Sequence, residues 1–204
     1  MWRVVPMQRK TEAGFTLIEL MIALVLLVIL VAMAAPSFVD TLDKRRVINA
    51  TQSMSAQILQ ARSLAVTRNR DVSLVVDPAP AGSAAWCFGL TDRAPPVALC
   101  DCEVLDPNAA DACTVRVPSV ANVNVLEPVL IRADEGSFPG VDLNLAVSPL
   151  VVTFEPTRGL ASGNATIEFA SPRGRETRVT VNRIGRISTC SPSEETLLGG
   201  INPC

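Results

Sequence analysis

The chain has 204 residues, a formal net charge of -2, 49% hydrophobic residues, and neither histidine nor tyrosine. This length suits one domain of ordinary size with an appended segment. The absence of histidine excludes Ser-His-Asp and Cys-His catalysis and histidine-rich metal sites. An enzyme would then need a carboxylate pair such as Asp134 and Glu135, which we interpret as a solvent-exposed turn. We therefore expect neither enzymatic activity nor a cofactor.

The mean hydropathy of +0.33 reflects one apolar segment and not a uniformly apolar chain. Residues 15–35 form a run of 21 residues whose only charge is Glu19. At about 1.5 Å per residue, such a helix spans the roughly 30 Å hydrocarbon core of a bilayer. The run is longer than the roughly 7 to 15 apolar residues of a cleaved secretory signal. Arg9 and Lys10 precede it, so the positive-inside rule predicts a cytoplasmic N-terminus and export of the chain after about Ala35.

Glu19 is unusual because a charged side chain inside a membrane helix costs about 2.5 to 3.5 kcal/mol on insertion scales. Such a residue is by default functional or paired with another charge. The alternative is that Glu19 lies near enough to the end of the span to reach the interface. Its position one helical turn after Phe15, which itself follows Gly14, favours a functional role.

Residues 14–20 read GFTLIEL, with basic residues before them and an uninterrupted apolar run after them. This string resembles the class III signal of type IV pilins and type II secretion pseudopilins. The resemblance implies that a prepilin peptidase cuts between Gly14 and Phe15 and that the new amino group of Phe15 is methylated. Residues 1–14 are then the leader peptide, which is shorter if translation begins at Met7.

The resemblance also implies a role for Glu19 in filament assembly. Its carboxylate would meet the cationic amine of Phe15 on a neighbouring subunit when the helix leaves the membrane. Assembly would then satisfy a charge that is costly to bury alone. The expected partners are the prepilin peptidase, the inner membrane, and other minor and major pilins.

Residues 36–70 are expected to continue the span as an amphipathic helix. Apolar residues recur there mostly at spacings of three to four, which places them on one helix face. They are Phe38, Leu42, Val47, Ala50, Met54, Ile58, Ala61 and Ala65. We expect this stripe to pack on the globular part. Asn69, Arg70 and Asp71 predict the end of the helix, because a β-rich run follows them.

The sequence of residues 71–204 predicts a series of short strands separated by Pro, Gly and Asn. The candidate strands are 72–76, 85–90, 123–133, 141–146, 150–154, 165–170, 178–182 and 186–189. The expected fold class is α+β and type IV pilin-like. A long N-terminal helix, with a membrane-spanning half and an amphipathic half, would pack on an antiparallel β body in the periplasm.

Three further segments narrow the resemblance: residues 60–68 (QARSLAVTR), 154–159 (FEPTRG) and 178–186 (RVTVNRIGR). They are similar to blocks of the GspH/FimT branch, which comprises the minor pseudopilin H of type II secretion and the minor pilins FimT and FimU. The resemblance implies a minor type IV pilin, held in the bacterial inner membrane and then assembled into the tip or initiation complex of a pilus. The alternative is the minor pseudopilin H.

All six cysteines follow the predicted membrane span, and an even number on the oxidising, exported side predicts disulfide bonds. They are Cys87, Cys100, Cys102, Cys113, Cys190 and Cys204. The sequence does not determine their connectivity. Our hypothesis pairs Cys190 with Cys204 and the other four with one another around the loop between Leu90 and Val117. The alternative is a metal site made of the first four thiolates, which the C-x-C spacing disfavours.

Charge is segregated along the exported part. Residues 71–157 contain twelve acidic residues and three arginines, whereas residues 158–190 contain six arginines and two glutamates. An arginine-rich surface suits phosphate groups because guanidinium forks match phosphate oxygens. The candidate residues for binding double-stranded DNA are Arg186, Arg183, Arg178 and Arg175. The alternative is that these arginines form ion pairs with acidic parts of the same or a neighbouring subunit.

Residues two apart on a strand share a face. We therefore expect Arg178, Thr180 and Asn182 to point outward. Val179 and Val181 should face the core.

The resemblance to competence-associated FimT gives the DNA hypothesis a more specific form. In that protein the last hairpin carries G-R-x-R, and its paired arginines contact DNA. Residues 185–188 here read GRIS, so Arg186 matches while Ser188 replaces the second arginine on the same face. This departure weakens the hypothesis unless Arg183, Arg178 or Arg175 compensates.

Overall fold

The computed structural model describes residues 14–78, 85–93, 99–122, 124–192 and 198–204. The chain divides into two units, Met1–Thr41 and Leu42–Cys204, which we describe separately. One helix, α1 (Leu17–Arg68), begins in the first unit and ends in the second.

The first unit consists of the apolar part of α1. An 18-residue window of the helix has a mean hydropathy of 3.0, and none of that window is buried. By length and composition the helix could therefore cross a membrane. Glu19 lies in its first turn, and the Phe15 side chain just before the helix is 86% exposed.

α1 ends two residues before the predicted limit at residue 70. Asn69 follows the helix with a positive φ of 51°, a left-handed conformation that asparagine tolerates better than most residues. Its backbone N–H donates to the carbonyl of Val66, and that of Arg70 donates to the carbonyl of Ala65. These bonds satisfy carbonyl groups that the helix end would leave without partners.

Ten strands follow α1 in the described part of the chain, with a short 3-10 helix, η1 (Glu135–Ser137), after the fifth. They are β1 (Val72–Asp77), β2 (Cys87–Thr91), β3 (Thr114–Pro118), β4 (Leu126–Leu130), β5 (Arg132–Asp134), β6 (Asp142–Leu145), β7 (Leu150–Phe154), β8 (Ala165–Ala170), β9 (Glu176–Val181) and β10 (Ile187–Cys190). They form two four-stranded sheets, β5-β2-β1-β7 and β10-β9-β8-β6, and a ribbon, β3-β4. Every pairing between these strands is antiparallel. The fold is α+β, as predicted.

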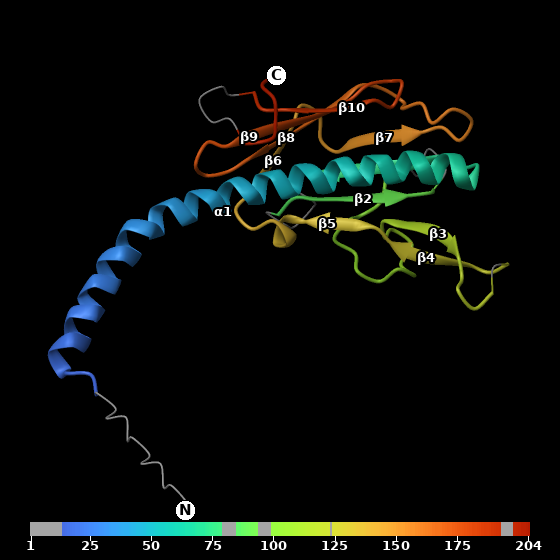
Figure 1. Ribbon diagram of the computed structural model, residues 1–204. Helices are drawn as coiled ribbons and strands as arrows, with labels where there is room; N and C mark the ends of the chain where they lie inside the picture. The colour runs from blue at the N-terminus through green and yellow to red at the C-terminus, as the bar shows by residue number, and fades with distance from the viewer. Residues whose placement is uncertain (1–13, 79–84, 94–98, 123, 193–197) are drawn as a thin grey trace, which may run out of the picture. The chain divides into compact units, whose positions relative to one another are not determined.

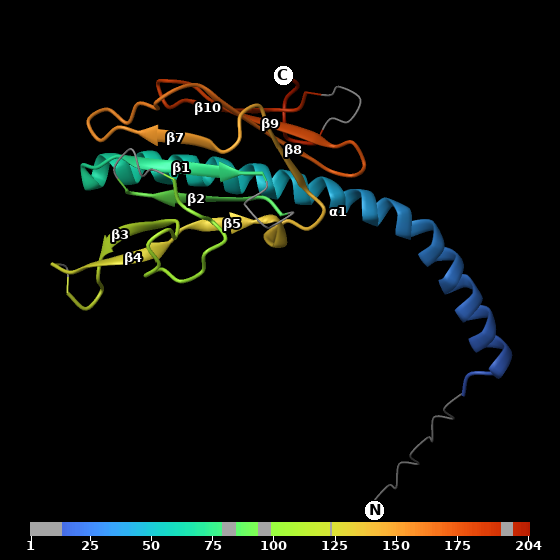
Figure 2. The ribbon, with the colours of Figure 1, turned by 180° about the vertical axis from the view of Figure 1, so that it is seen from behind.

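Within the second unit, the C-terminal half of α1 packs on the sheets. In Figure 2 the strand β1 crosses in front of this part of the helix, and in both Figure 1 and Figure 2 β2 runs along its lower side. The predicted stripe forms the contact, because Val47, Ala50, Met54, Ile58, Ala61 and Ala65 are all at most 1% exposed. They share one core with residues from both sheets, including Phe88 of β2 and Phe169 of β8. Earlier in the predicted stripe, Phe38 and Leu42 are exposed.

Apart from ends that differ by one or two residues, the strands differ from the prediction in two places. The expected strand 123–133 is two strands, β4 and β5, separated at Ile131, and residue 123 lies outside the described residues. Ile131 donates its N–H to the carbonyl of Cys113 and accepts the N–H of Leu90, so the chain changes partner there from β3 to β2. The strand β3 was not predicted, and it pairs with β4 along all five of its residues.

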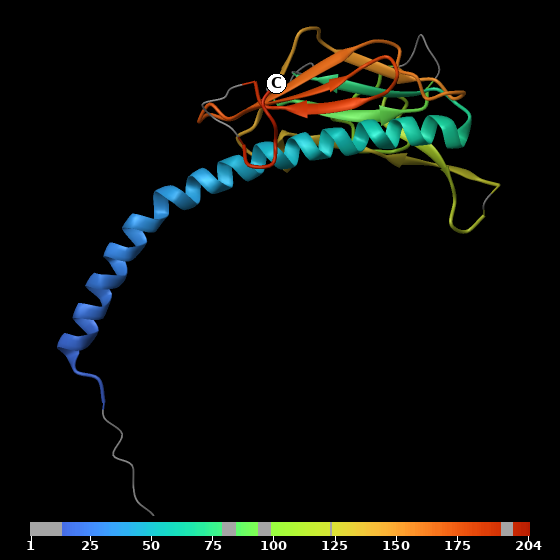
Figure 3. The same ribbon diagram turned by 45° about the horizontal axis from the view of Figure 1, so that its top comes forward.

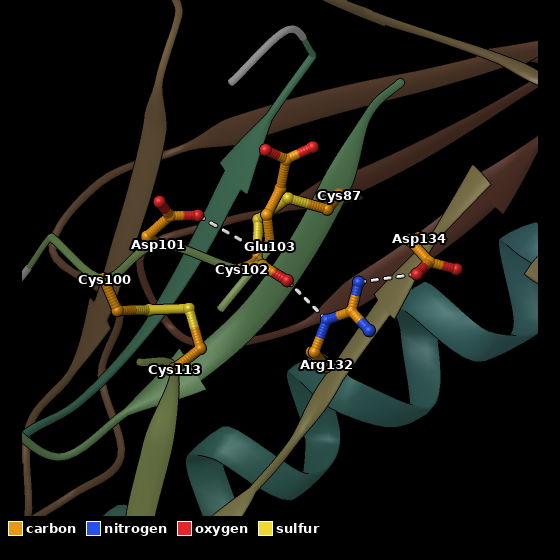
Figure 4. Close-up of a disulfide and its surroundings, with 8 residues drawn as sticks. All are labelled: Cys87, Cys100, Asp101, Cys102, Glu103, Cys113, Arg132 and Asp134. Carbon is orange, nitrogen blue, oxygen red and sulfur yellow. Dashed lines mark hydrogen bonds and ion pairs between the residues drawn. A yellow bond between two sulfur atoms is a disulfide. The ribbon is translucent and has the colours of Figure 1, made fainter. Parts of the chain in front are cut away.

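Three disulfides connect the six cysteines: Cys87–Cys102, Cys100–Cys113 and Cys190–Cys204 (Figure 4). The pairing of the last two cysteines matches the hypothesis, and the first four pair with one another. The alternative, a metal site made of four thiolates, is wrong, because all of these sulfur atoms are in disulfide bonds. Each bridge closes a loop of 13 to 15 residues, which stabilises a fold by about 3 kcal/mol in the chain-entropy model.

An arginine joins the first disulfide to the end of β5. Arg132 donates from Nε to the carbonyl of Cys102, and its Nη2 lies 2.5 Å from Oδ2 of Asp134 (Figure 4). The other oxygen of Asp134 accepts the backbone N–H and the hydroxyl of Ser137 and so caps η1. Our interpretation of Asp134 as part of an ordinary exposed turn was therefore wrong, because the side chain is only 34% exposed and carries these bonds.

The Asp134 contacts predict a pH-dependent contribution to stability. Partial burial raises the pKa of Asp134, but the hydrogen bonds from Arg132 and Ser137 and the attraction of Arg132 outweigh it and hold the pKa below the usual 3.8. A carboxylate with a lowered pKa stabilises the fold above its unfolded-state pKa, and this stabilisation is lost as the pH falls through the folded-state pKa. We expect Asp134→Asn to lower the free energy of unfolding at pH 7, with a difference from the parent chain that narrows below pH 3.8. Denaturant titrations of the full chain across this range measure it, and a difference that stays constant with pH would contradict the assignment.

Candidate functional site

The hairpin β9–β10 presents a polar face on the outside of its sheet. Thr180 lies opposite Ser188 on β10 and opposite Thr166 on β8, so three hydroxyl side chains form a row across the strands. Val179 and Val181, on the other face of β9, are at most 1% exposed, as predicted. The row lies in a shallow hollow of about 390 Å³ that Asn164, Asn182 and Arg186 complete.

The turn at residues 182–186 places two arginines at the end of this face. The N–H of Asn182 donates to the carbonyl of Arg186, and the Asn182 side chain accepts the N–H of Arg186. Gly185 has a φ of +75°, which this tight turn requires and which glycine adopts without strain. Arg183 and Arg186 are both exposed. Within the described residues, neither guanidinium has a hydrogen bond or ion pair.

The three segments that carry the narrower family resemblance meet beside this turn. Arg62, from the first segment, donates from Nη1 to the carbonyl of Gly185, from the third, at 3.3 Å. A Cβ atom on Gly185 would lie 3.2 Å from Nε of Arg62 and 2.9 Å from the carbonyl oxygen of Gly159, from the second segment. A Cβ on Gly159 would lie 3.0 Å from the Arg62 side chain. Both glycines therefore let the arginine and the two turns approach closely.

The other two candidate arginines are placed differently. Arg178 forms an ion pair with Glu168 on β8, with 2.6 Å between Nη2 and Oε1, so its charge is compensated within the sheet. Arg175 lies in the turn between β8 and β9, where its N–H donates to the hydroxyl of Ser171. Eight residues of extended chain separate it from Arg183, which is roughly 26 Å at about 3.3 Å per residue. Arg183 and Arg186 therefore share one turn but line different hollows, because Arg186 lines the hollow of the hydroxyl row and Arg183 lines a neighbouring one with Asp71 and Glu155. Arg178 and Arg175 lie outside this turn.

The residues expected to take part in processing and assembly lie in the first unit. Phe15 directly follows Gly14 and is exposed, and Glu19 lies one turn further along. The backbone N–H of Glu19 donates to the hydroxyl of Thr16. Among residues 14–41, and in the rest of the described chain, the Glu19 carboxylate has no hydrogen bond or ion pair, so it is open to a partner from another molecule.

Sequence reasoning missed Arg62 and the groove that it borders between α1 and β10. The signal was present, because Arg62 lies within the segment 60–68 that resembles the GspH/FimT branch. Arg62 is not part of the predicted apolar stripe, and only the fold shows that it meets the last hairpin.

Two family models match the chain. The first, "Prokaryotic N-terminal methylation motif", covers residues 9–35, and the second, "Type II transport protein GspH", covers residues 50–185. The second match spans more than half of the chain. The chain belongs to the GspH family. No curated protein and no solved structure matches it.

The two matches fit the geometry of this GspH-family chain. The methylation motif includes Gly14, Phe15 and Glu19, and the GspH match includes Arg62 and ends at Gly185. Together they make the chain a GspH/FimT-type minor pilin or pseudopilin, a structural subunit with an N-terminal motif for prepilin processing and an apolar helix suited to the inner membrane.

A pair of glycine substitutions tests the contact with Arg62. Gly185 and Gly174 have similar positive φ angles, +75° and +72°, but a Cβ on Gly174 would meet nothing within 4 Å. We expect Gly174→Ala to cost about 1 to 2 kcal/mol of stability from backbone strain alone. Gly185→Ala should cost more, because the added methyl group also meets Gly159 and Arg62. Denaturant unfolding of both variants of the full chain measures the difference, and equal losses would show that the close approach is unimportant.

Proposed function

We propose that this chain is a minor subunit of a type IV pilus. It would be held in the inner membrane as a prepilin, cut between Gly14 and Phe15, methylated on Phe15, and assembled with other minor and major pilins at the pilus tip or in the initiation complex. The methylation motif and the exposed apolar helix support this proposal. So does the open Glu19 carboxylate, which a cationic Phe15 amine of a neighbouring subunit would neutralise.

The second proposal is that the assembled subunit contacts DNA. One observation carries it: Arg183 and Arg186 are exposed at the end of a polar sheet face and have no side-chain partner among the described residues, whereas Arg158 and Arg178 are paired with Glu155 and Glu168. Guanidinium groups bind phosphates without reading the base sequence, and hydroxyl and amide groups contribute further phosphate contacts. The row of Thr166, Thr180 and Ser188 supplies such hydroxyl groups where FimT has its second arginine.

The minor pseudopilin H of a type II secretion system is the alternative, which the description of the matching family favours. The same processing and the same use of Glu19 would serve it. The genes beside this one discriminate between the two, because other minor pilin genes indicate a pilus and secretion genes indicate the alternative. Binding of DNA would have no evident use in a secretion filament.

Loss of the Glu19 carboxylate should prevent incorporation but not processing. We expect Glu19→Ala to be cut after Gly14 like the parent chain and to be absent from sheared filaments, because the neighbouring amine would lose its partner. Glu19→Asp, which retains the charge, is the matched control. Immunoblots of sheared filaments and membranes measure both, and normal incorporation of Glu19→Ala would contradict the role of Glu19.

DNA binding should depend on the turn arginines and not on net charge. We expect Arg186→Ala and Arg183→Ala each to weaken binding of double-stranded DNA about 3- to 10-fold at low salt and to reduce the salt dependence by about one phosphate contact. Arg173→Ala is the matched control, because this exposed arginine lies in the turn at the other end of β9. Titrations of the full chain in detergent at two salt concentrations measure the affinities. No binding by the parent chain, or equal losses in all three variants, would refute the proposal.

A further inference from the structure

A groove of about 840 Å³ runs between α1 and the outer edge of β10, within the second unit. Figure 3 shows the red strand β10 beside the helix. Apolar side chains line both walls of the groove: Ile48, Ala56 and Leu59 from α1, and Ile184, Ile187 and Ile201 from the C-terminal region. Leu59 is 57% exposed and Ile184 is 62% exposed, so the groove leaves apolar surface open to solvent.

One wall of this groove is a strand edge with open backbone groups. β10 is the edge strand of its sheet. The bond from the N–H of Asn182 to the carbonyl of Arg186 shows that these two residues form a hydrogen-bonded pair at the start of the ladder between β9 and β10. Because bonded pairs alternate in an antiparallel ladder, Ile187 and Thr189 direct their N–H and C=O groups away from β9. These groups have no hydrogen bond to any described residue, so the edge is available to a further strand.

The C-terminal tail already uses the next position along this edge. Ser191 donates its N–H to the carbonyl of Asn202 at 2.8 Å and accepts the N–H of Cys204 at 3.0 Å. The Cys190–Cys204 disulfide holds the tail in this position. An extended segment therefore pairs with the edge at Ser191, and at Thr189 and Ile187 the same edge has no partner among the residues that the structure describes.

The length of the groove and the small side chains along its α1 wall suit a short extended segment. Thr51, Ser55 and Ala56 of α1 line it with small side chains, which leave room above the helix. From Ile48 to Arg62 the helix extends about 21 Å at about 1.5 Å per residue. A strand of six residues at about 3.3 Å per residue covers nearly the same length.

The charged residues that line the groove within the described part of the chain are both arginines. Arg62 and Arg186 lie at the end beside the hairpin turn. A segment with a carboxylate at that end would be attracted to both guanidinium groups. Only a peptide supplies alternating N–H and C=O groups to a strand edge together with apolar side chains.

We propose that this groove binds an extended segment of about six residues from another protein subunit, with alternating apolar side chains and a carboxylate near Arg62 and Arg186. The segment adds to β10 as a further strand and lies over α1. This interaction goes beyond the proposed function and does not depend on DNA binding. Backbone hydrogen bonds to Ile187 and Thr189 supply affinity, and the apolar walls and the two arginines supply specificity.

The experiment selects peptides from a random hexapeptide display library on the full chain in detergent micelles. The most enriched peptide is then synthesised and its affinity is measured by fluorescence anisotropy. Thr189→Pro removes the outward N–H without removing a bond to β9, and Thr189→Ala is its matched control. Ala56→Trp fills the groove, and Gln60→Trp places the same side chain on an exposed helix position that does not line it.

We expect the enriched peptides to share alternating apolar residues and an Asp or Glu, and to bind Thr189→Pro and Ala56→Trp about 10-fold or more weakly than the parent chain. Thr189→Ala and Gln60→Trp should bind as the parent does. The proposal is overturned if no peptide family is enriched, or if Thr189→Pro binds the peptide normally. It is also overturned if the parent chain forms dimers that Thr189→Pro dissociates, because a second copy would then occupy the edge. DNA titrations of the same variants separate the two proposals, since Thr189→Pro retains Arg183 and Arg186.

Discussion

The burial of one stripe of α1 against both four-stranded sheets is the interaction on which the rest of the second unit depends. Alanines at positions 50, 61 and 65 keep the helix close to the strands, and Met54 and Ile58 fill the space between them. Because β1, β2 and β7 lie in one sheet and β8, β9 and β10 in the other, this helix is the element that both sheets share. The position of the last hairpin therefore follows from how the helix packs.

Arg62 connects this packed helix to the turn of the last hairpin. It lies at the edge of the buried stripe and fits against two glycines that come from turns far apart in the sequence. In the hairpin turn beside it, Arg183 and Arg186 are exposed, and the groove along α1 opens next to this turn. Arg186 lines both hollows, so one side chain separates the polar sheet face from the apolar groove.

The sequence predicted the features that depend on local pattern. These features are the apolar run, the methylation motif, the stripe of α1 and the alternation of β9, which all follow from residues close together in the chain. Most of the strands were predicted for the same reason. Features that depend on register could not be predicted in this way. The pairing of Arg178 with Glu168 needs the alignment of β8 with β9, the break at Ile131 needs the change of partner from β3 to β2, and the open edge of β10 needs the order of strands in the sheet.

The first two disulfides overlap along the chain, because Cys100 lies inside the loop closed by Cys87 and Cys102, while its partner Cys113 lies outside it. A single break of the backbone anywhere between Cys87 and Cys113 therefore leaves both fragments covalently joined through at least one bridge. If the two disulfides closed consecutive loops that did not overlap, a break of the backbone between the loops would separate the chain into two molecules. A subunit exposed to proteases outside the cell would remain one molecule after a cut in this acidic region, with β1 and β2 still connected to the strands that follow.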